Sequence, residues 1–392
     1  MIPTLRRWQT DALDNWIHSQ RGIAKVVTGA GKTVFGLACY EHARRANPGL
    51  QLLIVVPGVP LQDQWTTESC ELLDLAPTEI AAHGGGQRGG RGSPVHVAVI
   101  NTARQLSSEL TRSGDWMLIV DECHRAGSYE NRRALNGEFV ATLGLSATPE
   151  RQYDEFFEEV IEPALGPVIY EYSYADGLRD GVLSPFRLLN YGIPLSDEEI
   201  DQISRTETAI AIKFSEGYDI TDEALKRLFM RRARISQQAQ ARIPAVVNLA
   251  EQFQGRRGLI FHESIDAANK IVAALKTRDH RVAPYHSRLG TVARLRNLRM
   301  FRTGQLDLLV TCRALDEGLD VPDAEIGIIA ASTSSIRQRI QRMGRVLRPS
   351  SRKDEAKVLT LYALDSERQR LETEIENLEG LAEACWFKVT FQ

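Results

Sequence analysis

The sequence predicts an α/β protein with two tandem parallel-sheet domains, a helical segment between them and a helix near the C-terminal end. Two series of short apolar runs alternate with amphipathic helical patterns, which is typical of parallel sheets covered by helices. A chain of 392 residues is also too long for one ordinary hydrophobic core. We therefore expect a first domain at 1–190, a helical linker or insert at 191–245, a second domain at 246–365 and a helical tail at 366–392.

The composition is that of a globular protein, with 43% hydrophobic and 25% charged residues. A formal net charge of −3 gives no global sign of a polyanionic partner, so a nucleic-acid surface would have to come from clustered arginines. The five cysteines lack the paired spacing of a zinc site or a disulfide scaffold, which favours a reduced, cytoplasmic location. The N-terminus is polar and no eighteen apolar residues run together, so we expect neither a signal peptide nor a membrane segment.

A glycine-rich loop lies between the first predicted strand and the helical pattern that follows it. Its residues are Thr28, Gly29, an alanine, Gly31, Lys32 and Thr33. Glycines let the backbone turn sharply and direct its N–H groups inward, toward an anion. Lys32 would reach the β- and γ-phosphates of a nucleotide, and the Thr33 hydroxyl would bind Mg²⁺. The alternative is an ordinary glycine turn with an exposed lysine.

An acidic pair follows the apolar strand at 117–120. Asp121 and Glu122 stand at the carboxyl end of this strand, where ligand sites lie in parallel α/β sheets. Asp121 would hold Mg²⁺, directly or through water, and Glu122 would activate the attacking water as a general base. The alternative is a pair of acids that caps a helix. A later strand ends in hydroxyl residues, Ser146 and Thr148, which can hydrogen-bond the nearby His124.

The first predicted helix and a second polar segment add candidate binding residues. Gln9 lies on an amphipathic helix ahead of the glycine-rich loop and has the donor and acceptor needed to read an adenine edge. A solvated glutamine is the alternative. The segment at 101–104, which follows the strand at 95–100, carries polar groups suited to phosphate contacts.

The middle of the chain is helical and charged from residue 196 to 241. It contains a cluster of basic residues: Lys226, Arg227, Arg231, Arg232 and Arg234. The cluster predicts either a basic face for nucleic acid or a solvated helix balanced by its own acids.

A second α/β series then begins. The expected elements are strands at 258–262, 282–287 and 308–311, a helix at 264–275, a closing strand at 358–362 and a docking or partner helix at 368–381.

An arginine-rich stretch lies near the end of the second series. Arg345 and Arg348 are three residues apart, so they share one face of a helix. A fixed, always-charged guanidinium can stabilise the charge that develops on a transferred phosphoryl group. The alternative is a solvated face or a general anion patch. The position of the stretch favours the catalytic interpretation.

The order of these segments, from Leu5 to Arg348, resembles the superfamily 2 helicases and translocases, with a D-E-C-H acid box. The resemblance is to the DNA repair and restriction branch, and it implies two RecA-like domains with ATP and Mg²⁺ in the cleft between them. It implies that Gln9 touches adenine and that Asp320 lies near the ribose. Lys32, Thr33, Asp121 and Glu122 would then run hydrolysis.

The resemblance also assigns roles outside hydrolysis. It implies coupling of hydrolysis to movement by His124, Ser146, Thr148 and Gly318, and nucleic-acid contacts by Pro57, Gln62, Thr102, Arg104 and Thr311. Gln341, which stands where many relatives carry histidine, would join Arg345 and Arg348 in closing the ATP site.

The function that the resemblance implies is that of an ATP-dependent DNA helicase or translocase. Two alternatives remain open: an RNA helicase, and a nucleotide-gated ATPase subunit of a larger defence or repair complex. A nuclease or another protein subunit is a possible partner, because no nuclease pattern occurs in the chain.

Overall fold

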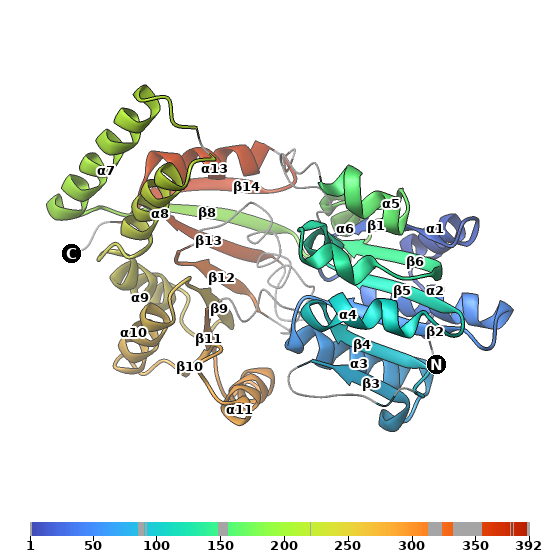
Figure 1. Cartoon of the computed structure of the whole chain (residues 1–392). Coiled ribbons are helices and arrows are strands. Elements are labelled where there is room, and N and C mark those ends of the chain that lie inside the picture. The colour runs from blue at the N-terminus through green and yellow to red at the C-terminus, as the bar shows by residue number, and fades with distance from the viewer. Residues whose placement is uncertain are drawn as a thin grey trace. The chain divides into compact units, whose positions relative to one another are not determined.

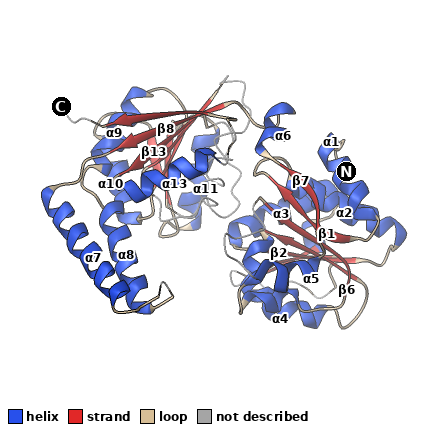
Figure 2. Ribbon diagram, turned by 90° about the horizontal axis from the view of Figure 1, so that it is seen from above, coloured by secondary structure: helices blue, strands red, loops and turns tan. Residues whose placement is uncertain are grey.

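The computed structural model describes residues 2–84, 90, 92–147, 156–219, 221–312, 324–331, 355–376, 378 and 380–389. The chain divides into two compact units, with the boundary between Leu183 and Ser184. Each unit contains one sheet of parallel strands with helices on both of its faces (Figures 1 and 2). Within the described ranges, every helix is too short or too polar to cross a bilayer.

The first unit has the strand order β3-β4-β2-β5-β6-β1-β7. Its central strands are continuous apolar runs that are almost completely buried, as a parallel sheet covered on both faces requires. The strands are β1 (Arg21–Val26), β2 (Gln51–Val56), β3 (Ile80–His83), β4 (Val95–Val99), β5 (Trp116–Asp121), β6 (Phe139–Ser146) and β7 (Val168–Tyr172). The helices are α1 (Arg7–Ile17), α2 (Lys32–Ala46), α3 (Val59–Leu73), α4 (Ile100–Leu110), α5 (Glu162–Leu165) and α6 (Tyr174–Arg179), with short turns η1 (Pro77–Glu79), η2 (Cys123–Gly127), η3 (Asn131–Leu135) and η4 (Phe157–Ile161).

The second unit has the strand order β10-β11-β9-β12-β13-β8-β14. The strands are β8 (Phe186–Gly192), β9 (Gly258–Phe261), β10 (Val282–Tyr285), β11 (Leu308–Thr311), β12 (Ile326–Ile329), β13 (Ala356–Tyr362) and β14 (Glu383–Lys388). The helices are α7 (Asp197–Ser215), α8 (Glu223–Gln237), α9 (Arg242–Gln252), α10 (Ile265–Lys276), α11 (Thr291–Arg302) and α13 (Asp365–Glu376). The expected α/β class with two parallel-sheet domains is therefore confirmed.

The structure differs from the expected domain boundaries at two places. The boundary at residue 190 falls inside β8, which pairs with β13 and β14 and so belongs to the second sheet. The expected helical tail contains only α13, after which β14 adds an edge strand beside β8. The ring of Phe387 on β14 stacks on Tyr191 of β8, with 4.9 Å between centroids. Both differences depend on strand pairing between distant segments, which local sequence patterns do not encode.

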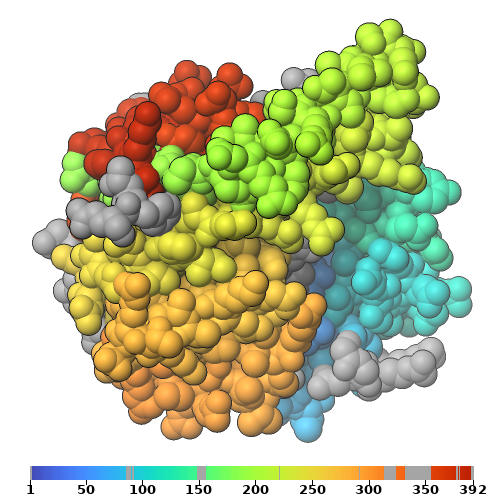
Figure 3. Space-filling model, turned by 90° about the vertical axis from the view of Figure 1, so that its left-hand side faces the viewer, coloured from blue at the N-terminus to red at the C-terminus, as the bar shows by residue number. Residues whose placement is uncertain are grey.

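The charged middle of the chain forms a helical hairpin of α7 and α8. Ser196 caps α7, since its hydroxyl accepts from the backbone N–H of Glu199 while the Glu199 carboxylate accepts from the Ser196 N–H. Figure 3 shows the hairpin, in yellow-green, standing out from the surface of the second unit. One face of α8 is exposed and basic, with Lys226, Arg227, Arg231 and Arg234 around Met230.

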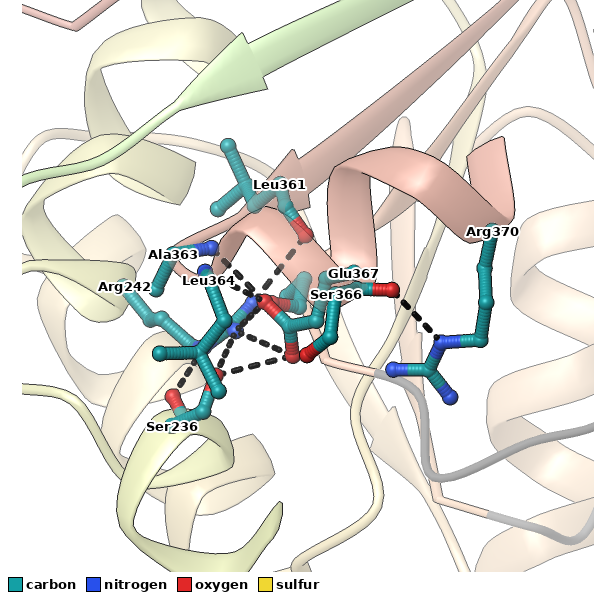
Figure 4. A network of polar contacts seen from close by, with 9 residues as sticks. Ser236, Arg242, Leu361, Ala363, Leu364, Ser366, Glu367 and Arg370 are labelled. Atoms are coloured by element: carbon teal, nitrogen blue, oxygen red, sulfur yellow. Dashed lines mark hydrogen bonds and ion pairs between the residues drawn. The ribbon is translucent and has the colours of Figure 1, made fainter. Parts of the chain in front are cut away.

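A buried arginine joins the hairpin to the body of the second unit (Figure 4). The Arg242 guanidinium donates to the backbone carbonyls of Ser236, Ala330 and Leu361 and to the carboxylate of Glu367. The Glu367 carboxylate also accepts from the Ser236 hydroxyl. Because its donors are all directed at fixed acceptors, Arg242 holds the end of α8 against the ends of β12 and β13 and the start of α13.

Two histidines lie against each other at the edge of the first sheet. The ring of His96 on β4 is fully buried, and its Nδ1 lies 2.9 Å from Nε2 of His83 on β3. His96 Nε2 lies 3.0 Å from the carbonyl oxygen of Ser93, so the hydrogen-bond network assigns the proton of His96 to Nε2. Burial and then the nearby His83 lower the pKa of His96 to about 4, and burial lowers the pKa of His83.

This pair predicts a loss of stability in mild acid. At pH values between about 4 and the ordinary pKa of 6.5, His96 is protonated in the unfolded chain and neutral in the folded chain. The free energy of unfolding should therefore fall as the pH drops through this window, by at most about 1.4 kcal/mol per pH unit for each proton. Urea unfolding of wild type and His96→Asn at several pH values measures the difference in slope. An equal slope in both proteins would contradict the prediction, and the exposed His18→Asn serves as the control.

Candidate nucleotide site

The glycine-rich loop connects β1 to α2 in the first unit. Gly29 and Gly31 have φ of 91° and 96°, in the left-handed region that favours glycine. Gly31 is the residue immediately before the first turn of α2, which begins at Lys32. The loop therefore places backbone N–H groups and the positive end of a helix at one point, which is an anion-binding arrangement.

The segment around the start of α1 holds this loop in place. Arg6 Nη1 and Trp8 Nε1 both donate to the carbonyl oxygen of Ala30, at 3.1 and 3.3 Å. Gln9 is buried, and its Nε2 donates to the Gly31 carbonyl oxygen at 3.0 Å while its Oε1 accepts from the Arg6 N–H at 2.8 Å. Gln9 thus positions the loop, and its contact with adenine stays a prediction. Arg6 and Trp8 were not expected as contacts of the loop, because only the fold brings them to it.

Lys32 and Glu122 face each other across the site. Lys32 Nζ lies 3.8 Å from Glu122 Oε1 and donates to the Val26 carbonyl oxygen at 3.3 Å. Glu122 follows β5 and has a φ of 50°, which costs a residue with a side chain about 1–2 kcal/mol. The lysine of the loop and the second acid of the box are thus within reach of one bound phosphate.

Asp121 is buried at the carboxyl end of β5, and both of its oxygens accept hydrogen bonds. Trp65 Nε1 on α3 donates to Oδ2 at 2.8 Å, and the backbone N–H of Glu122 donates to Oδ1 at 2.9 Å. Burial, followed by the neighbouring Glu122 carboxylate, raises the pKa of Asp121 to about 6, while Lys32 opposes the rise. Burial therefore disfavours the ionised form of Asp121. A cation bound beside it would stabilise that form.

His124 connects the acid box to the end of β6. Its Nδ1 lies 3.0 Å from the hydroxyl oxygen of Ser146 and 3.4 Å from Glu122 Oε2. Both His124 and Ser146 are buried. The structure therefore brings the acid box and the first hydroxyl of the expected coupling segment together, whereas Thr148 lies outside the described residues.

The residues of this site fit a magnesium nucleotide. The buried hydroxyl of Thr28 has no hydrogen-bond partner in the described part of the chain, which is costly unless a ligand supplies one. The Thr33 hydroxyl and the Asp121 carboxylate are oxygen donors of the kind that Mg²⁺ prefers. Lys32 and the helix start supply the positive charge that phosphate needs.

The four expected nucleic-acid residues of the first unit differ in what their side chains do. Gln62 is buried, and its Nε2 donates to the carbonyl oxygens of His83 and Val97, so its amide ties α3 to β3 and β4. These two bonds give Gln62 a role in packing the unit, and its contact with nucleic acid stays a prediction. Arg104 donates twice to the Asn131 side chain. Thr102 is exposed and Pro57 half-buried.

In the second unit, neighbouring strands end in polar side chains. The Thr311 hydroxyl, at the end of β11, is buried without a hydrogen-bond partner among the described residues. His286 follows the adjacent β10 and is also buried, with Nε2 bound to Asn269 and Nδ1 left without a partner there. His262 follows β9, and its Nδ1 accepts from the N–H of Ser264, which caps α10. His262 and His286 were not among the site residues expected from the sequence.

Five further expected site residues lie outside the described residues. They are Gly318, Asp320, Gln341, Arg345 and Arg348. Their roles stay predictions.

Comparisons with known proteins place both halves of the chain. Residues 2–151 match the family model "Type III restriction enzyme, res subunit", and residues 241–350 match "Helicase conserved C-terminal domain". The putative DNA 3'-5' helicase Rad25 of Halobacterium salinarum is 30% identical over 88% of this chain and 52% of its own length. The DNA 3'-5' translocase XPB2 of Sulfurisphaera tokodaii is 28% identical over 88% of this chain and 78% of its own length. The chain thus spans about half the length of the first of these relatives.

Solved structures share the fold. Dbp5 of S. cerevisiae, bound to RNA and ADP BeF3, has a TM-score of 0.67 at 14% identity and covers 97% of this chain and 89% of its own. The ATP-dependent Type ISP restriction-modification enzyme LlaBIII, bound to DNA, has a TM-score of 0.71 at 14% identity, covering 100% of this chain and 32% of its own. At these identities the likeness concerns the fold alone.

Proposed function

Because the chain belongs to the superfamily 2 helicases and translocases, we propose that it hydrolyses ATP and uses the cycle to move along or remodel DNA. The observation that carries the proposal is the convergence of Lys32, Asp121 and Glu122 at the end of β5 beside a glycine-rich loop. In this proposal Lys32 binds the β- and γ-phosphates and Glu122 takes a proton from the attacking water. Mg²⁺, when bound beside Thr33 and Asp121, neutralises charge on the phosphates.

In this proposal, residues from the second half of the chain also take part in ATP hydrolysis. Arg345 and Arg348 would stabilise charge on the transferred phosphoryl group, together with Gln341. Asp320 would contact the ribose. Gly318, His124, Ser146 and Thr148 would couple hydrolysis to movement. These assignments follow the family resemblance, from which the chain departs at Gln341, where many relatives carry histidine.

DNA is the proposed track. The relatives at 28–30% identity are named as a putative DNA 3'-5' helicase and a DNA 3'-5' translocase. The Thr311 hydroxyl, which has no hydrogen-bond partner among the described residues, lies at the end of β11 and could donate to a backbone phosphate. Thr102, Arg104 and Pro57 are proposed contacts in the first unit, and the basic face of α8 adds positive charge in the second.

The test is the rate of ATP hydrolysis measured against a panel of single-stranded DNA, duplex DNA and RNA. We expect DNA to stimulate hydrolysis, because binding of the DNA strand and binding of ATP favour the same conformation in such motors. Stimulation by RNA alone would instead support an RNA helicase. No hydrolysis under any condition would overturn the proposal.

A second candidate is an ATPase subunit that switches shape for a partner without travelling. The match of residues 2–151 to a restriction-enzyme subunit favours a partner such as a nuclease. Measuring displacement of a DNA triplex together with ATP turnover distinguishes a translocase from a switching subunit. Turnover without displacement would favour the switching subunit.

A further inference from the structure

Trp65 has no role in the proposed function, yet its indole contacts the acid box directly. It lies on α3, is 0% exposed, and its Nε1 donates to Asp121 Oδ2 at 2.8 Å. The other oxygen of Asp121 accepts from the backbone of Glu122, which is fixed by the chain itself. The hydrogen bond from the indole thus fixes the orientation of the Asp121 carboxylate.

The surrounding residues fix where the indole lies. Gln62, one turn earlier on α3, holds that helix against the sheet through the carbonyls of His83 and Val97. Gly36 on α2 leaves room for the ring, since a Cβ there would lie only 3.1 Å from Cη2 of Trp65. The ring is therefore packed against the helix that begins at Lys32 and cannot turn without moving α2 or α3.

We propose that Trp65 is a positioning residue that orients the Asp121 carboxylate for Mg²⁺. This inference rests on the proposed function, in which Asp121 binds the magnesium of a bound nucleotide. A carboxylate that is free to rotate loses conformational entropy when it binds a metal. A hydrogen bond that already fixes its orientation removes this entropic cost.

The test uses three variants of the full chain. Trp65→Phe removes the N–H donor and keeps a large ring in the core. Trp65→His keeps a donor, because imidazole Nε2 can occupy the same place in a five-membered ring as indole Nε1, but it loses more buried surface. Trp16→Phe is the matched control, since Trp16 is also 0% exposed and its indole donates at 2.9 Å to a buried acceptor, the Thr142 carbonyl oxygen.

The readout is the Mg²⁺ concentration that gives half of the thermal shift produced by ADP, with ADP binding in EDTA measured alongside. We expect this concentration to rise about 10–100-fold in Trp65→Phe and to stay unchanged in Trp16→Phe. Trp65→His should lie closer to wild type than Trp65→Phe, although its melting temperature in the absence of ligand is the lower of the two. ADP binding in EDTA should be the same in all variants that fold.

Two results would overturn the inference. One is a Mg²⁺ dependence of Trp65→Phe equal to that of Trp16→Phe. The other is a Trp65→His variant that needs as much Mg²⁺ as Trp65→Phe or more, since the effect would then follow the lost packing and not the donor. If wild type itself shows no Mg²⁺-dependent shift with ADP, the proposed function fails and the inference fails with it.

Discussion

Glu122→Gln is expected to stop ATP turnover and to leave ATP binding intact. The Glu122 carboxylate lies 3.8 Å from Lys32 and 3.4 Å from His124, so it stands among groups that hold it in place at the phosphate site. Glutamine has nearly the same shape and can keep hydrogen bonds, but it cannot accept a proton from water. Since general-base catalysis contributes about 10²–10⁴-fold, turnover should fall by roughly that factor. Steady-state hydrolysis and calorimetric binding of ATP to the same preparation measure the two effects.

The neighbouring Asp121 gives this variant a second signature. The Glu122 charge is one cause of the raised pKa of Asp121, after burial. Removing the charge should lower the pKa of Asp121, so the pH dependence of magnesium-nucleotide binding should move to lower pH. Because the same change removes an anion that attracts Mg²⁺, the affinity itself should not increase. The control is Glu171→Gln on β7, an exposed acid that pairs with Lys25. Turnover by Glu122→Gln at the parental rate would show that another group activates the water.

The fold was predictable where apolar patterns are local. The strands β2 and β5 each contain five consecutive apolar residues, so their assignment needed no partner. Strand β12 was not expected, although three other four-residue strands of the same sheet were, and β14 follows a charged helical pattern in the expected tail. Pairing of β8 with the second sheet depends on β13 and β14, which lie more than a hundred residues away in the sequence.

The site was predictable where its chemistry resides in a short motif. The glycine-rich loop and the acid box each occupy a few consecutive residues, and the structure brings Lys32 to Glu122. Trp65 was not predictable, because an indole on an amphipathic helix looks like any core residue until the fold directs its N–H at a carboxylate. Gln62 shows the converse. The family resemblance implies a nucleic-acid contact for Gln62, and only the fold shows that its amide donates to buried carbonyls on β3 and β4.

Lys32→Ala is expected to abolish both turnover and tight binding of ATP. Lys32 is the first residue of α2, and its ammonium group lies over the glycine-rich loop, where it donates to the Val26 carbonyl oxygen. In the proposed function it exchanges that contact for the β- and γ-phosphates, and its charge compensates theirs. Alanine leaves the backbone N–H groups of the loop in place but removes the charge. Hydrogen bonds to charged groups are worth about 1.5–3 kcal/mol each, so ATP affinity should fall by at least about tenfold.

The same substitution should disturb Glu122, which makes this variant informative beyond the loss of a phosphate contact. Without the ammonium 3.8 Å away, the Glu122 carboxylate loses the oppositely charged group that faces it across the site. Lys32→Arg is the matched variant, because it keeps the charge but places a planar, longer group in the loop, where the compact ammonium is required. We expect Lys32→Arg to recover part of the ATP binding and little of the turnover. Parental turnover in Lys32→Ala would place ATP hydrolysis at another site of the chain.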